Sequence, residues 1–94
     1  MRVHKTKRFT AELKEIVGFI AEDSVFYAKK FRRELLAELD KLGESEMRYR
    51  KSIYVDAPNV YDFIFKGHVI PYRINESKNR VEILGIFKHN IWRY

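Results

Sequence analysis

The sequence changes its hydrophobic period near residue 43, and this change constrains the fold more than any other feature. Two apolar series in the first half follow the three- and four-residue steps of a helix. They are Phe9, Leu13, Ile16, Val17 and Ile20, and then Ala28, Phe31, Leu35, Leu39 and Leu42. Asp23 or Ser24 can cap the second helix, and Gly43 stands where a helix commonly ends. A connection this short predicts an antiparallel helical hairpin.

The second half has the short apolar runs that are typical of β-strands. Residues 44–52 are polar and predict a loop. Candidate strands follow at residues 53–55, 60–65, 68–74 and 80–87. Short turns at residues 66–67 and 75–79 join the last three candidates, so they form an antiparallel meander. Pro71 lies inside one of these strands and cannot donate to a ladder, so we expect a bulge or an open edge there.

These elements predict an α+β fold for a single domain over residues 1–94, with the helical hairpin packed on one face of a small antiparallel sheet. The sequence has no cysteine, which excludes a disulfide framework and a thiolate metal site. No apolar run approaches the roughly 20 residues of a membrane span, and no signal-peptide apolar stretch follows the basic residues 1–8. We therefore expect a soluble, cytoplasmic protein.

The net charge of +6 is unevenly placed along the chain. Residues 1–8 carry four cations and no anion, whereas acids slightly outnumber bases in residues 9–42, and the rest of the surplus lies in residues 43–94. An excess of this kind favours polyanions such as RNA, or an acidic protein partner. A basic surface without a partner fits the same charge distribution, so charge alone leaves both interpretations open.

Familiar catalytic motifs are absent from the sequence. It has no phosphate-binding glycine loop, no HExxH and no Gly-x-Ser-x-Gly. The histidines, at positions 4, 68 and 89, have no spacing that suggests a metal site, so we expect neither a metal nor a cofactor.

The chemistry that remains is that of cations, histidine and aromatic rings. Metal-free RNA cleavage needs an acid and a base, and cations for the developing phosphorane charge. His89 can serve as acid or base, since its ordinary pKa lies near neutrality. The side chains that can stabilise charge are Arg48, Lys66, Arg73, Lys88 and Arg93, and Trp92 or Tyr94 can stack on a base. Strand parity points Lys88 and His89 to opposite sides.

Two apolar residues, Phe26 and Leu36, lie off the main stripe of the second predicted helix. They widen its apolar face beyond what one neighbouring helix needs. A broad core against a sheet explains them, and so does a groove for a partner helix. Both interpretations stay open at this level.

The order of these parts resembles that of the RelE/ParE superfamily of bacterial toxins. The nearest passages are HVIPYRI at residues 68–74 and VEILGIFKH at residues 81–89, which are similar to the last two strands of that family. The resemblance extends from Val3 to Trp92. It implies two helices on an antiparallel sheet. It also implies a toxin that is neutralised by an antitoxin encoded beside it, with which it would form a toxin-antitoxin hetero-oligomer.

The branches of the superfamily differ in activity. RelE-like members cleave mRNA in the ribosome. ParE-like members inhibit DNA gyrase and lack the catalytic residues of the nucleases. RelE-like proteins place lysines on the strand that corresponds to residues 60–65, where this chain has Asp62 and apolar residues. This departure disfavours the RelE-type chemistry. His89 fits the nuclease branch, and Arg73 fits both.

Three hypotheses follow from the resemblance and the residues. The first is a ParE-like toxin that inhibits gyrase by binding. The second is a RelE-like mRNA endoribonuclease with the catalytic residues His89, Arg73, Lys88 and Arg48. The third is a nucleic-acid-binding module that is not toxic.

The sequence also suggests which residues meet the partners. The residues predicted to bind the target are Lys66, His89, Trp92, Arg93 and Tyr94, and Phe26 and Leu36 are predicted to bind the antitoxin. For Trp92 there is an alternative, which is that its ring folds back and caps the core of the sheet.

Overall fold

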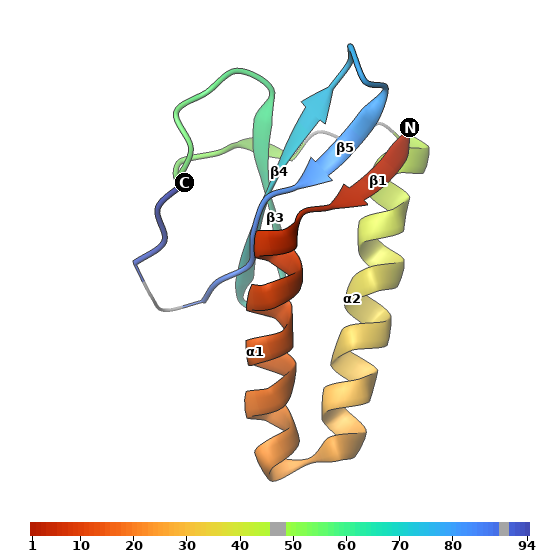
Figure 1. The fold of residues 1–94 in the computed structure, drawn as a ribbon, viewed down its shortest axis with the longest axis vertical. Helices are drawn as coiled ribbons and strands as arrows, with labels where there is room; N and C mark the ends of the chain where they lie inside the picture. The colour runs from red at the N-terminus through yellow and green to blue at the C-terminus, as the bar shows by residue number, and fades with distance from the viewer. Residues whose placement is uncertain (46–48, 89–90) are drawn as a thin grey trace.

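The computed structural model describes residues 1–45, 49–88 and 91–94. It confirms the α+β fold: a helical hairpin packs against a five-stranded sheet of order β1-β5-β4-β3-β2 (Figure 1). The elements are β1 (Arg2–Lys5), α1 (Lys7–Asp23), α2 (Val25–Ser45), β2 (Arg50–Lys51), β3 (Val60–Phe65), β4 (His68–Asn75) and β5 (Arg80–Ile83). Neither α1 nor α2 is long and apolar enough to cross a membrane.

Hydroxyl side chains start both helices. The Phe9 amide donates to Thr6 Oγ1 (3.1 Å), and the Tyr27 amide donates to Ser24 Oγ (3.1 Å), as expected of N-caps. The prediction that the second helix ends at Gly43 was wrong, because α2 continues to Ser45. Gly43 instead lets β1 approach α2, since a Cβ at this position would lie 2.9 Å from Val3 Cγ2.

The strand β1 was missed from the sequence. It pairs in parallel with β5, from Arg2 opposite Arg80 to Lys5 opposite Ile83, so one pair of an otherwise antiparallel sheet is parallel. Val3 is the only apolar residue of this short strand, and no alternation is visible in it. The strand forms because β5 offers it an edge to pair with.

Residues 53–55 are not the strand that their apolar character predicted, and β2 lies just before them. The backbone amides of these residues donate to side-chain oxygens and not to a neighbouring strand. The Ile53 amide donates to Asp62 Oδ2 (3.2 Å), and the amides of Tyr54 and Val55 donate to Ser52 Oγ (3.1 Å each). Such local bonds compete with strand pairing.

The bulge expected near Pro71 is present, on the neighbouring strand. Tyr72 pairs with Ile83, but Val69 next pairs with Phe87 as an isolated bridge. Between these two pairs, β4 has two residues, 70 and 71, whereas the neighbouring chain has three, residues 84–86. One extra residue on one side of a pairing defines a β-bulge. For this reason β5 ends at Ile83 and not at Phe87.

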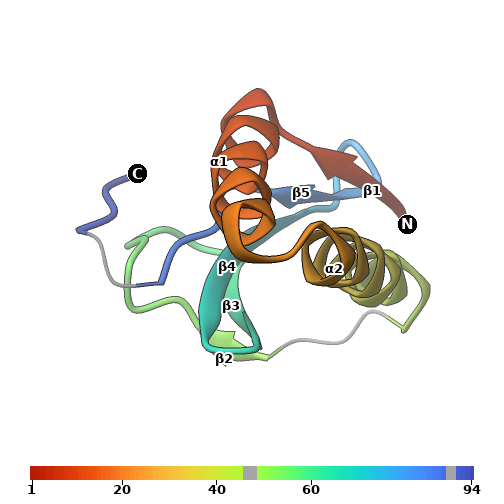
Figure 2. The same ribbon diagram turned by 90° about the horizontal axis from the view of Figure 1, so that it is seen from below.

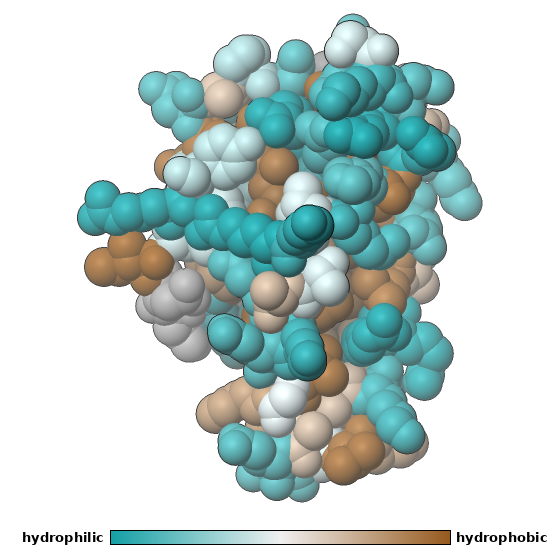
Figure 3. All heavy atoms as spheres, viewed as in Figure 1, coloured by the Kyte–Doolittle hydropathy of each residue, from teal (hydrophilic) through white to brown (hydrophobic). Residues whose placement is uncertain are grey.

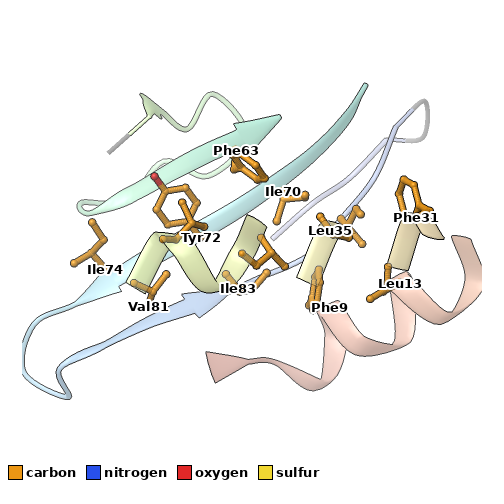
Figure 4. Packing of buried hydrophobic residues seen from close by; sticks show 13 residues of the cluster. Phe9, Leu13, Phe31, Leu35, Phe63, Ile70, Tyr72, Ile74, Val81 and Ile83 are labelled. Carbon is orange, nitrogen blue, oxygen red and sulfur yellow. The ribbon is translucent and has the colours of Figure 1, made fainter. Parts of the chain in front are cut away.

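The main core lies between the helices and one face of the sheet, which we call the inner face. Figure 2 looks nearly along α1 and α2 and shows them side by side against the sheet. Side chains from both helices and from β3, β4 and β5 converge in this core (Figure 4). A smaller cluster covers part of the opposite, outer face, and its buried members are Val55, Val60, Val69, Leu84, Phe87 and Trp92.

The two helical glycines allow a matched test of the packing of β1. Gly43→Ala should lower the free energy of unfolding by about 1–3 kcal/mol, because the new methyl group would push β1 away from α2. Gly18→Ala should raise it by roughly 0.5–1 kcal/mol, since a Cβ at Gly18 meets nothing within 4 Å and alanine is the better helix former. Urea unfolding measures both. Equal effects of the two substitutions would contradict the close contact at Gly43.

Candidate functional site

The outer face of β4 and β5 carries three charged side chains that we call the arginine cluster: Arg73, Arg80 and Glu82. Arg73 Nε donates to Glu82 Oε1 (2.9 Å), and Arg80 Nε donates to Glu82 Oε2 (2.9 Å). The hairpin register sets Arg73 directly opposite Glu82. The Glu82 side chain is only 7% exposed, so one buried carboxylate orients two guanidinium groups.

The pKa values of the cluster show that the three charges stabilise one another. Burial raises the pKa of Glu82, but the hydrogen bonds from Arg73 and Arg80 outweigh this effect and leave the pKa lower than usual. The hydrogen bond to Glu82 likewise raises the pKa of Arg73, against the opposing effect of burial. The cluster is therefore fully ionised at neutral pH.

A second buried acid lies on the same face. Asp62 of β3 is fully buried, and its Oδ2 accepts from the Ile53 amide and lies 3.5 Å from Arg50 Nε. Arg50 is exposed. Among the described residues of β2 to β5, the acids of the outer face are thus buried beside arginines, and these strands present mainly positive charge to solvent.

The C-terminal segment, residues 91–94, lies over the outer face. The Trp92 ring is 6% exposed and stacks on Phe87, with 5.4 Å between ring centroids and 14° between planes. The structure thus bears out the alternative in which Trp92 folds back onto the sheet. Tyr94 remains 60% exposed, with its ring centroid 5.9 Å from the Arg73 guanidinium carbon. Arg93 is exposed.

The cations predicted for catalysis are not all brought together. Lys88 lies against Gly67 in the β3–β4 turn, whereas Arg73 is six residues further along β4. At the usual rise per residue, about 20 Å of strand separates Arg73 from Gly67, beside which the Lys88 side chain lies. Lys66 is exposed in that turn and pairs with Glu34 of α2 (3.4 Å).

Two members of the predicted catalytic set, Arg48 and His89, lie outside the described residues. The structure therefore places Arg73 and Lys88 of that set and shows them apart. No group of His, Asp and Glu in the described ranges could hold a metal ion.

An apolar groove of 730 Å³ runs beside α1. Ile16, Phe19, Ile20 and Phe31 of the helices line it, together with Ile86 and Phe87. Glu12 and Glu15 lie along it, as do Lys66 and Lys88, so acids and bases flank its apolar floor.

The far end of the hairpin is also apolar. Phe19 is 72% exposed and Phe26 is 70% exposed, and Figure 3 shows hydrophobic side chains at this lower end of the molecule. Patches of this kind mark protein interaction sites. Leu36 is different, because it is half-buried and packs against the main core. Of the two surplus residues, Phe26 is the one that offers a free surface.

The sequence reasoning did not single out Arg80 or Glu82. Their pairing depends on register across strands, and the Arg73–Glu82 pair could have been found by pairing the two strands around the turn at residues 76–79. Glu12 of α1 was also missed. Its carboxylate reaches Trp92 Nε1 (3.0 Å), a contact 80 residues apart in sequence for which no local pattern exists.

Glu82→Gln tests the arginine cluster. At neutral pH we expect the variant to be less stable by about 1.5–3 kcal/mol, the usual contribution of hydrogen bonds to a charged group. Because the folded pKa of Glu82 is lowered, its stabilisation is present above the ordinary glutamate pKa and is lost as pH falls through the folded value. The difference from wild type should therefore shrink in acid. Urea unfolding against pH measures it, with the exposed Glu22→Gln as control. A gap that is the same at every pH would refute the ionic role.

Comparison with known proteins agrees with the fold. The family model described as the ParE toxin of the type II toxin-antitoxin system parDE matches residues 3–91. No curated protein matches the chain. A solved structure of the chromosomal ParDE toxin-antitoxin system from P. aeruginosa aligns over 96% of this chain and 97% of that chain, with a TM-score of 0.77 and 18% identity, a likeness that shows the fold. Because the family model spans nearly the whole sequence, this chain belongs to the ParE toxin family of type II toxin-antitoxin systems.

Proposed function

We propose that the protein arrests growth by binding DNA gyrase in the cytoplasm, and that it is not itself a hydrolase. Membership of the ParE toxin family supports the toxin class. The observation that carries the choice between binding and catalysis is the separation of Arg73 from Lys88. Acid–base cleavage requires its groups within hydrogen-bond reach of one phosphodiester, and Lys88 lies beside Gly67, a position about 20 Å along the strand from Arg73.

The engagement of Arg73 with Glu82 points the same way. A catalytic cation must face the developing charge of the transition state. Arg73 instead donates its Nε to a buried carboxylate and lies beneath the Tyr94 ring. Such an arginine is well placed to order a binding surface.

We assign the target-binding surface to the exposed residues around the anchored Trp92. Arg93 and Tyr94 follow it along the chain and are exposed; the predicted Lys66 is also exposed, but it lies in the β3–β4 turn and pairs with Glu34 of α2. An aromatic ring beside arginines is the composition that dominates binding energy at protein interfaces. In this assignment Trp92 acts as the internal anchor, and its neighbours make the contact.

The ParE family implies an antitoxin partner, and we assign its docking surface to the apolar groove and the hairpin end. Phe19 belongs to both, and Phe26 extends the apolar surface beyond the groove. A segment that binds here would bury apolar rings that now lie in water, which is the main source of affinity in helix-in-groove recognition. An acidic segment would also neutralise the basic surplus of the chain.

The target is tested by comparing DNA supercoiling with translation. We expect the purified protein to inhibit supercoiling by gyrase, while mRNA on translating ribosomes stays intact. The double variant Arg93→Ala/Tyr94→Ala should need at least tenfold more protein for the same inhibition, because these exposed side chains make the contact. Its melting temperature should stay near that of wild type.

The control for this experiment is Lys29→Ala, which removes an exposed cation from α2. It should inhibit gyrase as wild type does. Cleaved mRNA together with unaffected supercoiling would instead establish the RelE-like nuclease. A protein that arrests neither process would leave the nucleic-acid-binding module.

The antitoxin surface is tested by the variants Phe19→Ser and Phe26→Ser. Each should weaken binding of the antitoxin encoded beside the toxin by about tenfold or more, since large exposed rings are typical anchors of interfaces. Titration calorimetry measures the affinity, and Ile64→Ser, at an exposed apolar site on β3, is the matched control. The toxin assignment fails if the protein is harmless on expression and co-purifies with no small acidic chain from its operon.

A further inference from the structure

We propose that Glu12 of α1 is a positioning residue that latches the C-terminal segment, residues 91–94, in the orientation that binds the target. The latch consists of Glu12, Gly85, Trp92 and Arg8. Its effect on activity rests on the proposed function, in which Arg93 and Tyr94 contact the target, whereas its geometry stands independently.

The carboxylate of Glu12 joins three parts of the chain. Its Oε1 accepts from the Ile86 amide (3.1 Å) and from Trp92 Nε1 (3.2 Å). Its Oε2 accepts from Trp92 Nε1 (3.0 Å) and from Arg8 Nε (3.4 Å). One side chain on the first turns of α1 thus holds both the bulge after β5 and the indole of the C-terminal segment.

The Trp92 ring is held by its neighbours as well as at its nitrogen. Phe87 stacks on one side, and the Arg8 guanidinium carbon lies 4.1 Å from the ring centroid. A cation over an indole face is favourable, and Arg8 is also paired with Glu12. Because ring and nitrogen are both engaged, the orientation of Trp92 is determined along with its burial.

Gly85 provides the space in which this contact forms. A Cβ at Gly85 would lie 2.6 Å from Glu12 Oε1, 2.6 Å from Trp92 Cζ2 and 2.8 Å from Trp92 Nε1. Each distance is shorter than a side-chain carbon allows, so a Cβ at position 85 would displace the Glu12 carboxylate and the Trp92 indole. The sequence therefore reserves a glycine where α1, the bulge and Trp92 meet.

The latch extends to the surface through Tyr94. The rings of Trp92 and Tyr94 stack with centroids 6.2 Å apart, and Tyr94 in turn lies over Arg73 of the arginine cluster. Fixing Trp92 therefore fixes where Tyr94 meets the outer face. Without Glu12 the segment could still bury Trp92, but the indole nitrogen would lose its carboxylate partner.

A polar residue is a poor choice here if packing is the only purpose. Glu12 is half-buried beside the groove, and an apolar side chain would bury against Phe87 without the desolvation of a carboxylate. A carboxylate with directed donors fixes one geometry, where apolar contact would allow several. This property suits a segment that must be presented to a partner.

The test uses the full-length protein, in which Trp92 is the single tryptophan, so that fluorescence reports directly on the latch. Emission wavelength and acrylamide quenching are compared for Glu12→Ala, Glu12→Asp, Glu12→Gln and Gly85→Ala, and gyrase inhibition is measured on the same samples. Circular dichroism checks that each variant retains its helices. Glu22→Ala and Gly18→Ala are the matched controls, since Glu22 is exposed and a Cβ at Gly18 meets nothing.

Glu12→Gln keeps the reach and one oxygen, which can still accept from Ile86 and Trp92 as Oε1 does, but its NH2 group stands where Oε2 accepts from Trp92 and Arg8. Glu12→Asp keeps the charge but is one methylene too short. We expect Glu12→Ala, Glu12→Asp and Gly85→Ala to shift emission to longer wavelength, to raise quenching several-fold and to weaken inhibition at least tenfold. Glu12→Gln should fall between Glu12→Ala and wild type in both properties, and the controls should match wild type.

Several results would overturn the latch. If Glu12→Ala and Gly85→Ala leave emission and quenching unchanged, Glu12 does not hold Trp92. If Glu12→Asp were retained and Glu12→Gln lost, charge and not reach would matter. A freed Trp92 with full inhibition would remove the positioning role. If wild type itself does not inhibit gyrase, the proposed function fails, and the fluorescence series still decides whether Glu12 holds the segment.

Discussion

Pro71 lies in β4, the central strand of the sheet, where it has no amide to donate to its neighbour. Its carbonyl accepts from the Leu84 amide (2.8 Å), but no bond returns from Pro71. The chain leaves the ladder at this point, and its next regular pair is Val69 with Phe87. The amide of Ile86, released from the sheet by the bulge, donates to Glu12 (3.1 Å). One missing donor in the central strand thus directs the last segment of the chain toward α1 and makes room for Trp92.

Much of the fold could be predicted because it depends on local periods and turns. The helical stripes, the Ser24 cap and the tight turn at Lys66 and Gly67 each leave a short signal in the sequence, and Pro71 alone predicted a bulge. The parts that were missed depend on distant partners. β1 exists because β5 has an edge, and Gly43 is a contact for β1 and not a helix end. Nothing near these residues in sequence distinguishes them from a basic terminus and a terminator.

The candidate site divides along the same line. Arg73 and the C-terminal residues stood out by composition and by family resemblance, but their arrangement depends on register and on α1. Register sets Arg73 opposite Glu82, and the buried carboxylate turns two arginines into one ordered cluster. Trp92 is also understood only in three dimensions. A large aromatic residue near a chain end suggests a contact surface, whereas the structure buries its ring and leaves Tyr94 exposed beside it. Residue type drew attention to this region, and packing shows which of its side chains are buried and which are exposed.

The groove and the C-terminal segment share residues, which bears on how a toxin of this fold can be controlled. Glu12, Ile86 and Phe87 line the groove; Glu12 and Phe87 also contact Trp92, and the Ile86 amide donates to Glu12. A partner that fills the groove therefore touches the latch, whatever target the segment meets. Contact alone does not produce control, because a ligand shifts an equilibrium only by its difference in affinity for the two states. Covering the segment would block the target sterically, whereas competing with Trp92 for Glu12 would couple the two surfaces. Such competition is geometrically possible because the Glu12 carboxylate both lines the groove and accepts from Trp92 Nε1.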